Sequence, residues 1–117
     1  MEARFFEREG TDGQGEVIEF MEGEVLTRRE KVIVRMERLC PPGGNVNAKE
    51  PSHRIKVKAV YGEYIDSGAA WTKTGKQTGN LYLSVTMSDP QVSFALFPDE
   101  EAEGEWKADA SAFRGAA

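Results

Sequence analysis

The most informative chemistry in this sequence is a set of basic residues and one aromatic residue near its middle. The set consists of Arg54, Lys56, Lys58, Lys73, Lys76 and Tyr82. Residues 53–61 alternate between apolar and polar side chains, so the first three share one face of an expected strand. Cations beside an aromatic ring suit single-stranded nucleic acid, because phosphates pair with the cations and bases stack on the ring. The alternative interpretation is a solvated sheet face whose lysines oppose edge-to-edge aggregation.

A second candidate set is acidic and follows the last expected strand. It consists of Asp99, Glu100, Glu101, Glu103 and Glu105. Such a run is typical of a solvated acidic loop, and it could also attract cations. Together with the acidic N-terminal third, it would present negative charge to a basic protein, which makes it a candidate protein-binding surface.

No residues stand at spacings that predict a catalytic, cofactor or metal site. Nucleophilic catalysis would need Cys40 or a serine beside a base, and His53 is the one imidazole in the chain. His53 begins an alternating strand, so we interpret it as a structural or merely exposed histidine. Cys40 precedes two prolines, and we interpret it as a semi-buried small residue. We therefore expect a protein without enzymatic activity, cofactor or metal ion.

Charge is unevenly distributed along the chain. The 117 residues carry a formal net charge of −5, from 15 basic and 20 acidic side chains. Residues 52–80 carry five basic and two acidic side chains, a net charge of +3. Residues 81–117 carry two basic and seven acidic side chains, a net charge of −5. The overall acidity disfavours non-specific binding to duplex DNA, which depends on neutralising phosphates, and favours a basic protein as partner.

The length and composition indicate a single domain spanning residues 1–117. We expect residues 1–15 and 106–117 to be loosely ordered, because both ends are rich in polar or small side chains. The sequence has no apolar run of about 18 residues and no apolar signal segment, so neither a membrane span nor secretion is expected. A single cysteine fits the reducing cytoplasm.

Short alternating segments predict strands over residues 16–21, 53–61, 81–88 and 92–97. Residues 68–90 read as one hairpin with a Gly/Lys tip. We expect its apolar residues to build the core: Trp71, Leu81, Leu83, Val85 and Met87. Several short strands without a long helix predict a mainly β fold, a small antiparallel, strongly curved sheet or open barrel with a flexible acidic C-terminal tail.

Residues 25–40 allow two interpretations. Thr27-Arg-Arg-Glu30 matches the capping box of a helix, and apolar residues recur after it at helical spacing. Against this, Val32-Ile-Val34 is a β-branched run that alternates onward to Met36. We prefer a strand over about residues 31–38.

The expected hairpin also carries a family resemblance. Gly68-Ala-Ala-Trp-Thr-Lys-Thr74, followed by Asn80-Leu-Tyr-Leu-Ser-Val-Thr-Met-Ser-Asp-Pro90, resembles domain-of-unknown-function family 736, over about residues 53–97. The resemblance implies a small bacterial β protein of an accessory kind often carried on mobile elements. It implies no catalytic residues.

Two functional hypotheses follow. The leading one is a non-enzymatic binding protein, a mobile-element accessory or inhibitor that engages a basic host complex such as a CRISPR effector. Its acidic surface would occupy sites that normally hold phosphate. The other is a single-stranded nucleic-acid-binding protein that uses the basic strand face and the hairpin tip. Neither hypothesis involves a membrane.

Overall fold

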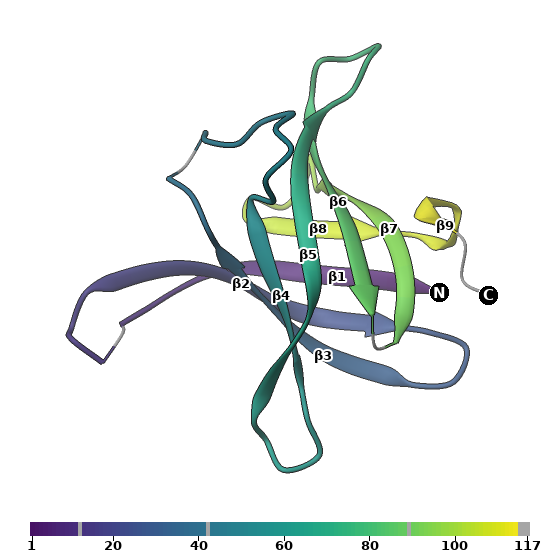
Figure 1. Ribbon diagram of the computed structural model, residues 1–117. Helices are drawn as coiled ribbons and strands as arrows, with labels where there is room; N and C mark the ends of the chain where they lie inside the picture. The colour runs from purple at the N-terminus through teal and green to yellow at the C-terminus, as the bar shows by residue number, and fades with distance from the viewer. Residues whose placement is uncertain (12, 42, 89, 115–117) are drawn as a thin grey trace.

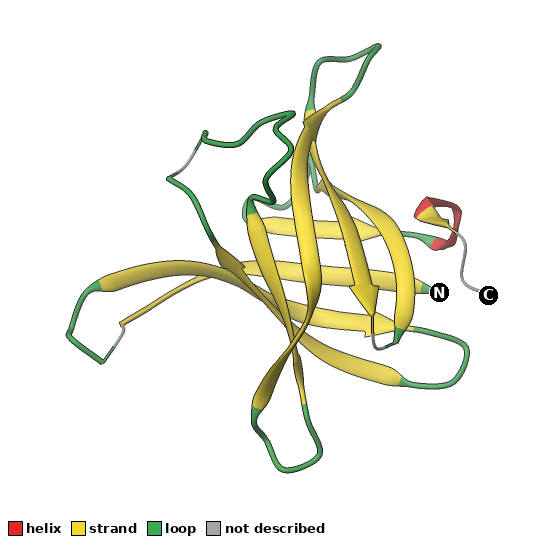
Figure 2. Ribbon diagram, in the orientation of Figure 1, coloured by secondary structure: helices red, strands yellow, loops and turns green. Residues whose placement is uncertain are grey.

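The chain folds into an antiparallel β-barrel, shown by a computed structural model (Figure 1 and Figure 2). The structure describes residues 1–117 except 12, 42, 89 and 115–117. Its elements are β1 (Glu2–Thr11), β2 (Val17–Leu26), β3 (Lys31–Arg38), β4 (His53–Lys58), β5 (Tyr64–Thr74), β6 (Leu81–Ser88), β7 (Gln91–Pro98), β8 (Glu105–Ala108), the 3-10 helix η1 (Ala110–Ala112) and β9 (Phe113–Arg114). Among the described residues, no helix is long and apolar enough to span a membrane.

The strands pair in a continuous ring. Each strand from β1 to β7 is antiparallel to the next, and β8 pairs with both β7 and β1. The short β9 pairs with β7 beyond the end of β8. The predicted antiparallel β fold is therefore confirmed, and the barrel is closed rather than open. Closure leaves the strands of the ring without a free edge.

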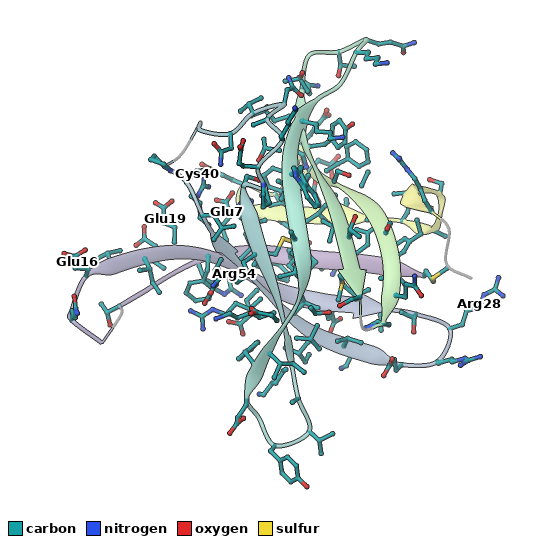
Figure 3. All side chains as sticks on the ribbon, in the orientation of Figure 1. Glu7, Glu16, Glu19, Arg28, Cys40 and Arg54 are labelled. Carbon is teal, nitrogen blue, oxygen red and sulfur yellow. The ribbon has the colours of Figure 1, made fainter. Side chains whose placement is uncertain are left out.

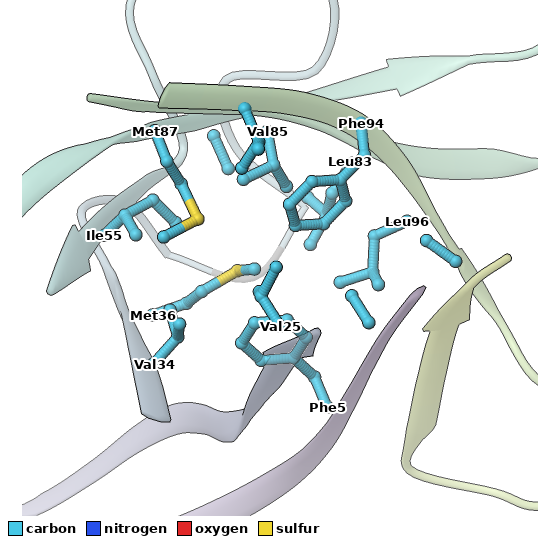
Figure 4. Packing of buried hydrophobic residues seen from close by; sticks show 14 of the residues in the cluster. Phe5, Val25, Val34, Met36, Ile55, Leu83, Val85, Met87, Phe94 and Leu96 are labelled. Atoms are coloured by element: carbon cyan, nitrogen blue, oxygen red, sulfur yellow. The ribbon is translucent and has the colours of Figure 1, made fainter. Parts of the chain in front are cut away.

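The inward-facing half of each strand fills the barrel (Figure 4). Successive side chains of a strand point to opposite faces, so an alternating apolar pattern delivers one side chain in two to the interior. The largest fully buried side chains include Phe5, Met36, Ile55, Met87 and Leu96. Leu83 and Val85 are buried among them, as the sequence predicted.

The segment from 25 to 40 contains a turn and a strand. Lys31–Arg38 forms β3, which confirms the preferred interpretation. The Thr27 hydroxyl accepts hydrogen bonds from the backbone N–H groups of Arg29 (3.3 Å) and Glu30 (3.2 Å), as it would in a helix cap. Here the same contacts close the β2–β3 turn, because the β-branched residues that follow pair with β2 and fill the barrel.

Both chain ends are more ordered than the sequence predicted. Residues 1–15 include all of β1, because Ala3 and Phe5 are buried against the core and the strand pairs with both β2 and β8. From residue 106 onward the chain forms most of β8, then η1 and β9. The end of the predicted flexible tail, residues 115–117, lies outside the described residues.

Two residues predicted for the core lie elsewhere. Leu81 begins β6 and is 44% exposed, because it stands at the rim of the barrel. Trp71 is out of phase with Ala70, whose side chain is the one that faces the interior, so the indole lies on the outer face. The small residues that precede Trp71 therefore indicate a closely packed strand, and they do not predict that the indole ring is buried.

Candidate functional site

Tyr82 and Phe97 form an aromatic pair on the outer face of β6 and β7. They stand one residue beyond the Leu83–Leu96 pair of the ladder, with ring centroids 5.6 Å apart and planes inclined by 30°. Lys73 lies directly opposite Tyr82 in the β5–β6 ladder, and Phe97 is 48% exposed. Lys73, Tyr82 and Phe97 therefore form a row across three strands, which we call the aromatic platform.

The β6 and β7 faces beside the aromatic platform are uncharged, whereas at its far end Phe97 is opposite Lys107, which pairs with Asp99. Because Leu83 and Leu96 face inward, the alternate residues of β6 and β7 face outward. These outward residues include Ser84, Thr86 and Ser93. Residues 68–88 and 91–98 contain two lysines and no carboxylate. An anion that approaches the platform along these strands meets no opposing charge from them.

Lys76 lies in the β5–β6 turn, just beyond the platform. The turn is closed by hydrogen bonds from Gly75 N–H to the Asn80 carbonyl and from Gly79 N–H to the Gly75 carbonyl, each 2.9 Å. Gly79 has a φ of 71°, a conformation that glycine adopts without strain. Lys73 and Lys76 are exposed and have no ion-pair partner within the described residues. Both cations can therefore meet an external anion.

Trp71 supports the loop beside the platform. Its indole Nε1 donates a hydrogen bond to the carbonyl of Lys49 (3.0 Å). The same loop is tied to β5 by Asn47, whose N–H donates to the Thr72 carbonyl (2.9 Å) and whose side-chain amide bonds Thr74 (3.0 Å). These contacts hold the backbone of Lys49 close to β5, where the exposed Lys49 is followed by the exposed Glu50.

The predicted basic residues of β4 are on the outer face but are partly neutralised. Arg54 and Lys58 are exposed, while Lys56 is half-buried. The Lys56 ammonium Nζ lies 3.0 Å from Glu37 Oε1, and Arg54 stands opposite Glu37 in the β3–β4 ladder. One carboxylate thus offsets part of the positive charge that the sequence pattern had placed there.

The structure also separates the two halves of the basic set. Arg54 is opposite Ala69 in the β4–β5 ladder, and Lys73 follows four residues further along β5. Four residues of extended strand span about 13 Å. Lys73, Lys76 and Tyr82 thus form one group, and the β4 residues form another.

The predicted acidic set divides in the same way. Asp99 lies 2.9 Å from Lys107, and Glu105 lies 3.2 Å from Arg4. The hydrogen bond from the Lys107 ammonium, followed by one from the backbone N–H of Glu101, lowers the pKa of Asp99. These two carboxylates are paired within the molecule. The remaining members, Glu100, Glu101 and Glu103, are exposed in the β7–β8 loop.

That loop is joined to the acidic N-terminal hairpin. Glu7 N–H donates to the Gly104 carbonyl (2.8 Å), and the Trp106 indole donates to Glu7 Oε1 (3.0 Å). Figure 3 shows Glu16 and Glu19 on the part of the β1–β2 hairpin that projects from the barrel. Two acidic segments that are far apart in the sequence therefore share one side of the molecule.

A cavity of about 490 Å³ opens at one end of the barrel, where β1 and β2 project past the other strands. We call it the mouth cavity. Its apolar lining includes Met21, Leu83 and Trp106, and its polar lining includes Glu19, Arg38 and His53. It was not predictable from the sequence, because its walls come from seven strands, the loop at residues 43–46 and Gly104.

His53 is buried beside the mouth cavity in a hydroxyl network. Its Nδ1 lies 2.9 Å from Ser52 Oγ, which accepts a hydrogen bond from the Thr72 hydroxyl (2.7 Å). Burial, followed by the charge of Arg38, lowers the pKa of His53 to about 4. The imidazole is therefore neutral at physiological pH. Ser52 is 1% exposed, so its hydroxyl serves this network and is closed to a substrate.

Besides His53, Cys40 and the carboxylates are the side chains whose chemistry suits metal binding. The Cys40 thiol is half-buried and lies 3.4 Å from the Gly44 carbonyl. Within the part of the chain that the structure describes, no three His, Cys, Asp or Glu side chains are grouped to hold a metal ion.

Phe97 is the main residue of the site that sequence reasoning passed over. The sequence placed it on the face opposite Phe94 and Leu96, but only the β6–β7 register brings it against Tyr82.

Comparison with known proteins identifies the family of the chain. No curated protein and no solved structure matches the chain. A family model described as protein of unknown function matches residues 17–109, most of the barrel, and the chain accordingly belongs to the DUF736 family.

Proposed function

We propose that this protein binds single-stranded nucleic acid on the aromatic platform. The observation that carries the proposal is the row Lys73, Tyr82 and Phe97, in which two adjacent rings follow a cation across three strands. Bases stack on exposed aromatic rings whatever their sequence, and lysines pair with the phosphates between them. Lys76 extends the positive charge beyond the row.

The local charge supports this proposal despite the acidic total. Residues 68–88 carry two lysines and no carboxylate, so the β5–β6 side of the platform is positive, while the β7 side adjoins Asp99, Glu100 and Glu101. Electrostatic attraction is screened over about 8 Å at physiological salt, so a strand on the platform responds mainly to nearby charges. The outward hydroxyl groups of Ser84 and Thr86 also offer polar contacts to a sugar–phosphate backbone.

The direct test is binding of a fluorescent single-stranded oligonucleotide, followed by anisotropy at several salt concentrations. We expect saturable binding that weakens steeply with salt. Tyr82→Ala and Phe97→Ala should each weaken binding by about 1–3 kcal/mol, the usual contribution of one stacked base.

Tyr61→Ala is a matched control, because Tyr61 is 95% exposed in the β4–β5 turn and lies outside the platform. It should bind like the unmodified protein. Absence of oligonucleotide binding at low salt would overturn the proposal. Equal losses in Tyr82→Ala and Tyr61→Ala would overturn the assignment of the platform.

A second candidate is a binding protein that engages a basic, nucleic-acid-handling partner with its acidic side. The observation in its favour is the contact between Glu7 and Gly104, which joins the acidic hairpin to the loop carrying Glu100, Glu101 and Glu103. Such a surface would compete for sites that hold phosphate. Either function would operate in the cytoplasm, where a lone Cys40 remains reduced.

Affinity purification from the native host tests this second candidate. The unmodified protein should retain a basic protein that Glu100→Lys/Glu101→Lys/Glu103→Lys loses. Glu30→Lys/Glu50→Lys/Glu63→Lys makes the same charge change at exposed turn and loop positions and should retain it. Recovery of no basic partner would count against this candidate without affecting the oligonucleotide test.

A further inference from the structure

The mouth cavity has the size and composition of a small-ligand site. Its volume of about 490 Å³ falls within the range of about 300–1,000 Å³ that is usual for ligand pockets. Met21 and Leu83 contribute buried apolar surface. The Trp106 indole joins them, and its orientation is fixed by the 3.0 Å hydrogen bond to Glu7. This lining suits one flat, apolar face of a heterocycle.

Two carboxylates at the cavity lack partners. Glu9 and Glu19 stand directly opposite each other in the β1–β2 ladder, and both line the cavity. Like charges in this position repel each other and destabilise the pair of strands. Within the described residues, neither carboxylate has a hydrogen bond or an ion pair. Both side chains are exposed at the cavity rim, so they offer acceptors to the N–H groups of a ligand that enters there.

The adjoining strands β3 and β4 supply the complementary groups. Arg38 lines the cavity and has no carboxylate within ion-pair distance among the described residues. It is opposite His53 in the β3–β4 ladder. The His53 side chain is buried and bonds Ser52 through Nδ1. The β2–β3 register places Arg38 next to Glu19, so a guanidinium and a neutral imidazole line the cavity directly beside the two glutamates.

We infer that the mouth cavity binds a guanine base. Guanine is flat, carries adjacent N1–H and N2–H donors on one edge, and carries the acceptors O6 and N7 on another. The donors match the carboxylates of Glu9 and Glu19, and the acceptors match the guanidinium of Arg38. Adenine lacks the paired donors and presents an amino group where guanine has O6.

This inference deepens the proposed function and rests on it for the source of the base. The cavity and the platform are adjacent at two places. Thr72 lines the cavity and the next residue, Lys73, belongs to the platform; likewise, Leu81 lines the cavity and the next residue, Tyr82, belongs to the platform. A strand on the platform therefore passes the cavity rim and can turn one unstacked base inward, as single-stranded readers do. Free guanosine offers the same chemistry, so both sources are tested.

The first experiment titrates nucleosides against Trp106 fluorescence in a Trp71→Phe background, where Trp106 is the remaining tryptophan. Guanosine should quench saturably and bind at least about tenfold tighter than adenosine, because a site built for hydrogen bonds rejects a ligand that cannot make them. Inosine lacks the N2 amino group and should fall between them. Equal binding of guanosine and adenosine, or no binding of guanosine, would overturn the inference.

Variants locate the site. Glu19→Gln should weaken guanosine binding by about tenfold, since a charge-assisted bond becomes a neutral one. Glu100→Gln is the control, because Glu100 is exposed away from the cavity lining. Arg38→Met is a second cavity variant that should also weaken binding. Unchanged guanosine affinity in both folded cavity variants would contradict the assignment.

Oligonucleotides separate this inference from the proposed function. A thymine oligonucleotide with one central guanine should bind more tightly than the same oligonucleotide with adenine. If thymine oligonucleotides bind but guanosine and the guanine substitution have no effect, the guanine site is overturned and the platform remains. If guanosine binds and no oligonucleotide does, the platform is overturned and the ligand is the free nucleoside.

Discussion

Two long hairpins, β1–β2 and β5–β6, are built alike and charged differently. Each contains a glycine, Gly23 or Gly68, at a point where a Cβ would overlap a backbone carbonyl of the neighbouring strand. Each also sends apolar side chains into the same core. Residues 2–26 carry two basic and eight acidic side chains, whereas residues 64–88 carry two basic and one.

The difference shows that one barrel can present opposite chemistry at two places without altering its interior. In β1–β2 the carboxylates of Glu9 and Glu19 line the mouth cavity. In β5–β6 the lysines lie on the outer face and in the turn, beside Tyr82. The total charge of the chain averages these regions and conceals the basic one. If the two hairpins divide their roles in this way, substitutions in each should have different effects.

Replacing Phe5 should have the largest effect. Phe5 is fully buried in β1, so Phe5→Ala should lower the free energy of unfolding by about 3–5 kcal/mol. Trp71→Ala should lower it by about 1–2 kcal/mol, because the indole covers only part of the outer face and makes one hydrogen bond. Urea unfolding followed by circular dichroism measures both. Equal losses would mean that β5, like β1, depends on a buried aromatic ring.

Acidification should have the next largest effect, through His53. Its pKa is about 4 in the folded protein, against about 6.5 when unfolded, so the unfolded chain binds the proton first. Stability should be fully present above pH 6.5 and fall by about 3 kcal/mol as the pH approaches 4. Below the folded pKa, His53 contributes no further loss.

His53→Gln isolates this contribution, since glutamine is uncharged and can still bond Ser52. The variant should show a flatter dependence of unfolding free energy on pH between 6.5 and 4. If the unmodified protein and His53→Gln show the same dependence of unfolding free energy on pH, the His53 imidazole does not control acid stability. Titration of carboxylates would then account for the loss of stability in acid.

The parts of the molecule that the sequence predicted are those governed by local alternation. The strands around Ile55, Val85 and Phe94 follow from a period of two, and so does the outward position of Tyr82. The strand at 31–38 was also predictable, since β-branched residues outweighed a helix-cap pattern.

The remainder depends on register and closure, which a single sequence does not contain. Phe97 meets Tyr82 only because β6 and β7 pair with that register. β1 looked loosely ordered because its outward residues are charged, although Phe5 fills the core. Glu105 and Asp99 looked like free surface charge until closure of the barrel placed Arg4 and Lys107 against them.

Neutralising the hairpin tip should have an intermediate effect on nucleic-acid binding. If Lys73 and Lys76 each pair with one phosphate, Lys73→Gln/Lys76→Gln should reduce the slope of log affinity against log salt by about 1.4. The variant should fold normally, because both side chains are exposed. Arg28→Gln/Arg29→Gln, at the β2–β3 turn, is the matched control and should leave the slope unchanged. A similar change of slope in both variants would mean that the attraction is general and that the two hairpins do not differ in role.

The smallest effect is expected at Lys56, which tests where the basic region ends. Its ammonium is 3.0 Å from Glu37, and such partly exposed ion pairs contribute about 0–1 kcal/mol, so Lys56→Met should scarcely change the unfolding free energy. Oligonucleotide affinity should also be nearly unchanged, because the Lys56 charge is already offset and lies away from Tyr82. Glu37→Gln provides the converse variant, since it releases Lys56 and Arg35 together. If Lys56→Met weakens oligonucleotide binding as much as the hairpin-tip variant does, the nucleic-acid interface extends across β4. The difference in charge would then distinguish whole faces of the barrel rather than the two hairpins.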